Sequence, residues 1–494
     1  MPSPRPLGLI GSYPRVFWVA NVMELFERAA YYGLNSVLAI YLSDEVVNRG
    51  LGFSEQSVGF LQGLIYACTY IIPILGGALA DRYGYRKMLI VAFSMLATGY
   101  FVSGHMSTYG AIFASLLIMA TGAGLFKPII SGTIARSTNE GNSGFGFGIY
   151  YWMINLGAFL APLVVSVLKG FSWTAVFTAS SLYCALMLLP AIVLYRDPPR
   201  PENSKTIRQV LSGAARVLGD ARFMLMIFVY SGFWILYFQN FGSVLWFLRD
   251  FIDPAPVNAL FASIGISLNF DSEHVTVINA GTIILLQVVV SRIVKNVKPL
   301  HAMVAGISVG VLGFVCLAFA TNVWILILGI SVFSIGEMTA HPKYYSYVGL
   351  VAPQDKKAVY MGYAFLYGVI GSLVGSNLGG VMYEAILKPL VGTQDPSGVI
   401  RGFWLVFAAM GVVAMVGLMF YNKYFAKDTP STAARARSIM IGVYSVLILA
   451  GIWFLYQSLF GGTVIAYRTA IQATIMLLLG TGGMLISFRR QHAE

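Results

Sequence analysis

The first apolar segment of the chain carries charged residues at helical spacing. Glu24, Glu27, Arg28, Tyr31 and Asn35 recur at intervals of three and four residues, which places them on one face of a helix. Charges near a bilayer centre are costly, so this face must meet a partner or a wet cavity. Two carboxylates around a guanidinium can take up a proton and exchange partners. A purely structural ion-pair network is the alternative.

Polar residues also interrupt two later apolar segments of the first half. Lys127 stands before Pro128 in an apolar run, and we expect it to serve coupling rather than to snorkel to the interface. Tyr151 and Asn155 lie one helical turn apart, so both side chains can point into the same cavity.

The second half offers fewer ionisable residues. Glu337 is the only acidic residue well inside its apolar blocks, and it precedes His341 by one turn. Trp234, Gln239 and Asn279 supply polar groups on two other segments. His341 is read either as a satisfied polar group or as a proton relay.

These residues are carried by long apolar blocks. Of the 494 residues, 57% are hydrophobic and 11% are charged, whereas an average soluble domain is about one quarter charged. About 20 residues span a bilayer core, so the sequence predicts an all-α integral membrane protein. The fourteen expected spans are approximately 15–43, 56–80, 87–105, 110–135, 146–168, 172–195, 223–248, 274–294, 299–320, 324–351, 358–388, 400–424, 437–459 and 465–487.

The basic residues indicate the orientation. Lys and Arg gather in loops that a cytoplasmic N-terminus places inside the cell, and the opposite loops are richer in Asp and Glu. Both termini are therefore expected in the cytoplasm, in a cell membrane that would be the inner membrane of a Gram-negative source. The net charge of +12 follows from this asymmetry and does not indicate nucleic acid. No cleavable signal peptide is expected.

The longest basic loop divides the chain into regions. We expect a six-helix bundle over 1–195, a cytoplasmic linker over 196–222, a second six-helix bundle over 223–425, and two further helices with a basic tail over 426–494. The two added helices carry no predicted buried charge and are interpreted as peripheral packing elements.

The loop after the second span has a specific pattern. Gly76-Gly77-Ala78-Leu79-Ala80-Asp81-Arg82-Tyr83-Gly84-Tyr85-Arg86-Lys87 resembles the signature loop of the major facilitator superfamily. Asp81, Arg82 and Arg86 are expected to act in gating, since Asp81 can pair with basic groups across the cytoplasmic face. This resemblance implies a fold and not a substrate.

The motifs together resemble the proton-dependent oligopeptide transporters, a branch of that superfamily. The first helix of this family reads Glu-x-x-Glu-Arg-Phe-x-Tyr-Tyr-Gly. The resemblance covers the twelve-helix core and rests on the matches Glu24 to Gly33, Tyr70 before Asp81, Lys127-Pro128, Tyr150 to Gly157, Trp234, Gln239, Asn279 and Gly336-Glu337. It implies proton coupling by Glu24, Glu27, Arg28 and Lys127. It also implies a cavity lined by Tyr31, Tyr70, Lys127, Asn155, Asn279 and Glu337; we add Glu337 to the expected coupling set.

The chain departs from this family at three positions. Asn35 replaces an Arg that helps to hold a peptide's carboxylate, Phe238 replaces an acidic residue, and Ala364 replaces a Trp. The family's bacterial members place two extra helices between the bundles, whereas here two helices follow the second bundle. Asn35 and Phe238 are still expected at the substrate, with a weaker hold on charged groups.

The resulting functional prediction is proton-coupled symport of small peptides or related zwitterions by alternating access, in a monomer, without cofactor or metal. A carrier or exporter of a non-peptide solute is the main alternative, and a non-transporting receptor or channel-like protein remains open. An enzyme is not expected, because no nucleophile–base set, phosphate loop or metal-ligand spacing is found. Cys68, Cys184 and Cys316 lie in apolar blocks and are interpreted as packing residues.

Overall fold

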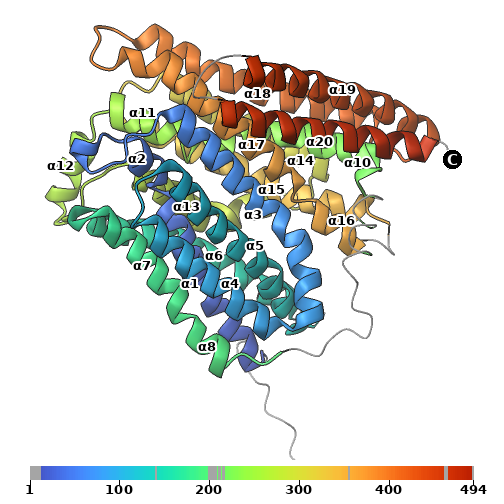
Figure 1. The fold of residues 1–494 in the computed structure, drawn as a ribbon, viewed down its shortest axis with the longest axis horizontal. Helices are drawn as coiled ribbons and strands as arrows, with labels where there is room; N and C mark the ends of the chain where they lie inside the picture. The colour runs from blue at the N-terminus through green and yellow to red at the C-terminus, as the bar shows by residue number, and fades with distance from the viewer. Residues whose placement is uncertain are drawn as a thin grey trace, which may run out of the picture.

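The computed structural model describes residues 13–139, 142–197, 209, 213, 217–353, 357–460 and 466–491. Within these ranges the chain is helical and contains no strand. Most of the predicted 196–222 linker, the first twelve residues and the last three lie outside the described residues. Two bundles of helices pack against each other, and a pair of helices lies against the second bundle (Figure 1).

The first bundle contains the predicted spans 1 to 6. Its helices are α1 (Arg15–Asn35), α2 (Leu38–Ser43), α3 (Glu55–Tyr83), α4 (Tyr85–Ser103), α5 (Tyr109–Arg136), α6 (Ser143–Phe171), α7 (Trp173–Leu186) and α8 (Leu188–Val193), with a 3₁₀ turn η2 (Val46–Asn48). Gly84 separates α3 from α4 at φ 97°, a backbone conformation that residues with a Cβ rarely adopt. Ser54 begins α3 by accepting a hydrogen bond from the Ser57 N–H.

The second bundle contains the predicted spans 7 to 12. Its helices are α10 (Ala221–Gln239), α11 (Ser243–Phe251), α12 (Ala255–Ser263), α13 (Glu273–Ile293), α14 (Pro299–Ala318), α15 (Val323–Val351), α16 (Lys357–Tyr363), α17 (Leu366–Met382) and α18 (Ser397–Tyr424), with a π turn η4 (Tyr383–Leu387) and a 3₁₀ turn η5 (Lys388–Leu390). The predicted spans 7 and 11 are each broken into two helices, and α12 was expected to be loop.

Twelve helices of the described chain are long and apolar enough to cross a membrane. The other two predicted spans are α1, which contains Glu24, Glu27 and Arg28, and α4, which begins with Arg86 and Lys87. Charge thus explains why these two helices fall outside the apolar set. The protein is a multi-pass membrane protein with the predicted two-bundle fold.

The two added helices form a hairpin. α19 (Pro430–Phe460) and α20 (Ala466–Gln491) lie side by side, and α19 packs on α10 (Figure 1). The predicted absence of buried charge here needs a correction. Arg468 of α20 is partly buried, and its Nη1 donates to Ser57 Oγ of α3 at 2.8 Å. Gln472 donates to Asn377 of α17 at 3.0 Å, so α20 contacts both bundles.

Candidate functional site

A cavity of about 1390 Å³ lies between the bundles. Its walls come from α1, α3, α5 and α6 of the first bundle and from α10, α13, α15, α16 and α17 of the second. The predicted residues that line it are Glu24, Arg28, Tyr31, Tyr70, Lys127, Tyr151, Asn155, Trp234, Phe238, Asn279 and Glu337. Residues more than 300 positions apart are therefore brought to one site.

On the α1 side of the cavity, Arg28 is already paired. Its Nε donates to Glu27 Oε2 at 2.6 Å and its Nη2 donates to Glu27 Oε1 at 2.8 Å. Glu24 Oε1 lies 3.5 Å from Arg28 Nε, and the other Glu24 oxygen is buried without a hydrogen-bond partner. Glu27 is fully buried behind the lining, so it reaches the cavity only through Arg28.

Lys127 brings a second positive charge to the same wall. Its ammonium lies 5.1 Å from the centroid of the Tyr70 ring and 5.9 Å from that of Tyr31. No carboxylate of the described residues lies within 4.0 Å of it, and its nearest acceptor is the Thr69 carbonyl at 3.5 Å. Lys127 thus faces the cavity as a cation without an ion-pair partner.

Glu337 is the corresponding group of the second bundle. Its Oε2 accepts a hydrogen bond from Asn279 Nδ2 at 3.0 Å, and Asn279 also donates to Ser334 Oγ at 2.8 Å. No cation of the described residues lies within ion-pair distance of Glu337. The cavity therefore holds one unpaired cation on the first bundle and one unpaired carboxylate on the second.

The structure does not bring Asn35 and Gln239 to the cavity. Asn35 Nδ2 donates to the carbonyl of Tyr31, and Asn35 Oδ1 accepts from the Tyr66 hydroxyl at 3.0 Å. Gln239 Nε2 donates to the Gly375 carbonyl, and its Oε1 accepts from Ser243. Both side chains are 1% exposed, and their polar groups are used inside the protein. Neither residue has the geometry for the solute contact that the sequence predicted.

Two positions that depart from the family pattern are linked through Tyr66. Its hydroxyl donates to Asn35, and its ring stacks on Phe238 with centroids 5.3 Å apart. Beside them, Gln62 of α3 donates to the Phe241 carbonyl at 2.9 Å. Aromatic stacking and hydrogen bonds, from Tyr66 to Phe238 and from Gln62 to Phe241, therefore join the two bundles at the place where the family pattern has opposite charges.

Only part of the aromatic lining was predicted from the sequence. Further walls of the cavity are formed by Tyr32, Tyr150, Tyr237, Phe241, His341, Tyr345 and Tyr367. A signal existed in α10 and the turn after it, where Trp234, Tyr237, Phe238 and Phe241 recur at helical spacing. In buried helices this spacing does not tell a cavity wall from ordinary core.

One end of the cavity is closed by contacts between the bundles. We call this the outer end, following the orientation that the basic loops predict. The first of two seams lies between α3 and α17, where a Cβ at Gly59 would collide with the Ser376 carbonyl and a Cβ at Gly380 with the Glu55 carbonyl. Only glycines permit this close approach of two backbones.

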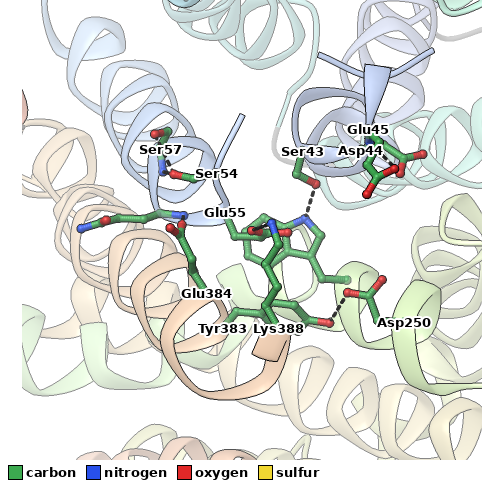
Figure 2. A network of polar contacts seen from close by, with 12 residues as sticks. Ser43, Asp44, Glu45, Ser54, Glu55, Ser57, Asp250, Tyr383, Glu384 and Lys388 are labelled. Carbon is green, nitrogen blue, oxygen red and sulfur yellow. Dashed lines mark hydrogen bonds and ion pairs between the residues drawn. The ribbon is translucent and has the colours of Figure 1, made fainter. Parts of the chain in front are cut away.

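A polar network closes the first seam above these glycines (Figure 2). Glu55 is fully buried; its Oε2 accepts from Lys388 at 2.6 Å, and its Oε1 lies 3.4 Å from Arg249 Nη2. The Gln56 N–H donates to Glu384 at 2.8 Å, across the same seam. The sequence reading gave no role to these residues.

The second seam lies between α6 and α13. Lys169 of α6 contacts Asp271, and its Nζ lies 2.6 Å from Glu273 Oε2. At the opposite end of the cavity, none of the ion pairs between described residues joins the two bundles. The pair of Asp81 with Arg136 at 3.0 Å, for example, lies within the first bundle. Ion pairs therefore cross both seams of the outer end, and in the first seam close backbone packing at glycines adds to them.

The predicted gating residues lie on the first bundle. Asp81 accepts from Arg136 and from the Tyr85 hydroxyl, and Arg86 contacts Asp197 and Ile192. Arg82 lies over the ring of its neighbour Tyr83. The described contacts of the three residues stay within that bundle, so they do not latch the two bundles together here.

The chain matches the family model of the Major Facilitator Superfamily over residues 22–376. It belongs to the major facilitator superfamily. Membership places it among transporters and not enzymes. The signature loop and the two bundles of this superfamily protein agree with that assignment.

Several relatives are named for transport, one of them for transport of di- and tripeptides. The chain is 31% identical to an uncharacterised transporter, YclF, of Bacillus subtilis over 32% of each chain. It is 27% identical to a di-/tripeptide transporter of Lactococcus lactis over 50% of this chain and 49% of the relative. These alignments span about a third and half of the relatives' lengths. A multidrug resistance protein MdtH of Klebsiella pneumoniae is 24% identical over 74% of this chain and 86% of that protein.

Solved structures show the same fold. A crystal structure of a POT family transporter in complex with 5-aminolevulinic acid matches with a TM-score of 0.66 and 20% identity. The match covers 86% of this chain and 98% of that chain. The resemblance to the oligopeptide transporter branch is thus confirmed in fold.

Proposed function

We propose that this protein is a secondary transporter that moves a small zwitterion, a peptide or a related solute, together with protons. One observation carries the proposal: Lys127 and Glu337 line the same cavity from different bundles, and neither has an ion-pair partner among the described residues. An uncompensated buried charge is destabilising, and a solute with a carboxylate and an ammonium group would compensate both. Binding such a solute therefore draws the bundles together.

Proton coupling is assigned to the predicted set Glu24, Glu27, Arg28, Lys127 and Glu337. The free Glu24 oxygen beside the Arg28–Glu27 pair offers a place for a proton in this buried set. Neutralising one carboxylate would free Arg28 to bind elsewhere, which links protonation to rearrangement of α1. Alternating access of the two bundles, cytoplasmic termini, residence in the cell membrane and function as a monomer belong to the same proposal.

Three forms of one ligand test the charge assignment. Binding of a dipeptide, its C-terminal amide and its N-acetyl form is measured by thermal shift for the unmodified protein, Lys127→Met and Glu337→Gln. Lys127→Met should weaken dipeptide binding by about tenfold to a hundredfold and leave the amide unchanged, since one charge-assisted contact is lost. Glu337→Gln should do the same with the N-acetyl form unchanged.

The exposed Glu45→Gln is the matched control for a lost carboxylate, and its binding should equal that of the unmodified protein. Equal losses for all three ligand forms would contradict the assignment of one charge to each bundle. Uptake into proteoliposomes that follows an imposed proton gradient tests the coupling, and uptake that depends on sodium instead would overturn it.

A second candidate is export of a less charged, aromatic or apolar solute. The aromatic lining of the cavity and the stacking of Tyr66 on Phe238 favour this candidate, as does similarity to a protein named for multidrug resistance. Inside-out vesicles separate the candidates: an acidic lumen should drive accumulation of a solute that is exported in exchange for protons, whereas symport should accumulate solute only when the proton gradient is directed inward.

A further inference from the structure

The second seam contains buried polar groups that the cavity does not use. Lys169 of α6 is the only cation among the described residues that pairs with Glu273 of α13, and it shares its charge with Asp271. Glu273 is fully buried, whereas the Asp271 side chain is 48% exposed. Two carboxylates from one bundle thus depend on one ammonium group from the other.

Three buried atoms in the first turn of α13 have no hydrogen-bond partner within the part of the chain that the structure describes. They are Glu273 Oε1, His274 Nε2 and Thr276 Oγ1. The Asp271 N–H donates to His274 Nδ1 at 3.2 Å, which makes Nδ1 the acceptor and leaves the ring proton on Nε2. His274 is therefore neutral in this arrangement, and its Nδ1 lies 3.7 Å from Glu273 Oε1.

We propose that Glu273 is a proton-binding site of the outer end, occupied when the α6–α13 seam is open and empty when it is closed. Opening removes Lys169, so two carboxylates two residues apart are left without a cation, and one of them gains by binding a proton. An O–H bond forms on Glu273 with a proton from the outer solution. On closing, the Lys169 ammonium replaces that proton, which returns to the same solution.

Asp271 is the weaker candidate for this proton. Partial burial opposes its charge, but the Lys169 ammonium and hydrogen bonds from Ser272 lower the pKa of Asp271 below its ordinary value. The Ser272 N–H donates to Asp271 Oδ1 at 2.6 Å from the same loop, so this contact survives when α6 moves away. Glu273 has no equivalent side-chain donor besides Lys169 among the described residues, and it takes the proton first.

The first seam supplies the matched comparison. Glu55 is equally buried, but its two oxygens each face a cation, Lys388 and Arg249. Opening that seam leaves no pair of acids that would favour a proton on Glu55. External acidification should therefore loosen the α6–α13 seam through Glu273 and not the α3–α17 seam.

The inference rests on the proposed function for its orientation, and a distance measurement tests it separately. Spin labels at Phe171 and Ser263, introduced in a variant without Cys68, Cys184 and Cys316, report the opening of the outer end across the α6 side in lipid nanodiscs. The ratio of open to closed molecules should rise as pH falls from 8 to 5, approaching about tenfold per pH unit for a single proton.

Three variants sharpen the outcome. Glu273→Gln should raise the open fraction and abolish its pH dependence, while Glu55→Gln should alter the open fraction and keep the pH slope. Asp271→Asn should also keep the slope. If Glu273→Gln does not fold, Lys169→Met replaces it. The closed seam then has no ammonium group to displace the proton from Glu273, so the pH slope should become shallower.

A pH slope that survives in Glu273→Gln, or its absence from the unmodified protein, would overturn the inference. Proton-driven uptake is scored in parallel. Its absence with the slope intact would reject the proposed function and leave the proton site standing, and its presence without the slope would do the reverse.

Discussion

The two seams of the outer end close the same cavity by different physics. Between α3 and α17, glycines bring the backbones together, and Glu55 is paired with two cations, Arg249 and Lys388. Figure 2 shows Glu55 beside Lys388. Between α6 and α13, one cation serves two carboxylates, and three polar atoms stay unsatisfied. A seam whose polar groups are satisfied is a stable hinge surface, whereas one with unsatisfied groups is poised to open.

The appended hairpin adds to this asymmetry. Arg468 of α20 contacts α3 and Gln472 of α20 contacts α17, so α20 bridges the two helices that form the first seam. The ion pairs of the second seam involve only α6 and the segment that begins α13. The first seam is thus reinforced, and we expect most of the movement at the second.

The largest effect is expected from filling the glycine contact. Gly380→Leu would place a side chain against the Glu55 backbone, and overpacking of this kind costs about 1–3 kcal/mol or more. Because backbone cannot yield, the first seam should stay open and solute uptake should be lost. Gly281→Leu is the control on the second seam, where the neighbour is the Phe159 ring at 3.3 Å and a side chain can move. Uptake should fall less for Gly281→Leu; equal losses would refute the difference between the seams.

The next effect concerns the charges of the first seam. Glu55→Lys would gather three cations at one buried place, and breaking a buried ion pair costs about 3–5 kcal/mol. Uptake should fall steeply, and labelling of Ser376→Cys by an impermeant maleimide in a cysteine-free protein should become fast. Combining Glu55→Lys with Lys388→Glu should restore part of the activity. No rescue by this exchange would show that the pair does not hold the seam.

A smaller effect is expected from the hairpin. Arg468→Ala removes its hydrogen bond to Ser57, worth about 1 kcal/mol. The melting temperature should fall by a few degrees, and maleimide labelling at Ser376→Cys should quicken while the spin-label distance across the second seam stays the same. The exposed Thr474→Val on the same helix is the control. Equal changes at both seams would argue against a local reinforcement.

The smallest effect is expected from Asp271→Asn, which should change the melting temperature by an amount that does not depend on pH. Because the folded pKa of Asp271 is lowered, its charge stabilises the closed protein at every pH above its ordinary value near 3.9, and the contribution is lost only as pH falls below that. The half-exposed ion pair is worth less than about 1 kcal/mol. The difference in melting temperature between the unmodified protein and Asp271→Asn should therefore be small and constant from pH 7 to pH 5. A difference that vanishes near pH 6 would assign the outer-end titration to Asp271 instead of Glu273.

The sequence by itself determined the helices and their grouping. Block length and hydropathy alone predict spanning helices, because a bilayer demands internal hydrogen bonding over a fixed thickness. The charged face of α1 and the isolated Lys127 and Glu337 could also be recognised from the sequence. Ionisable residues are rare in membrane-spanning helices because burying a charge there costs free energy, and those that occur usually have a function. Hydropathy and the spacing of charged residues depend only on neighbouring positions in the chain, so both can be predicted from the sequence.

Only the tertiary structure decided which polar groups are free. Asn35 and Gln239 were both expected at the substrate, yet the side chain of each makes its hydrogen bonds inside the protein. Glu55 and Lys388 are 333 positions apart, and the sequence around neither residue indicates that the two form an ion pair. Whether a charge is paired or available depends on the packing of distant helices, and helical periodicity fixes the face of a residue but not the neighbour that it meets.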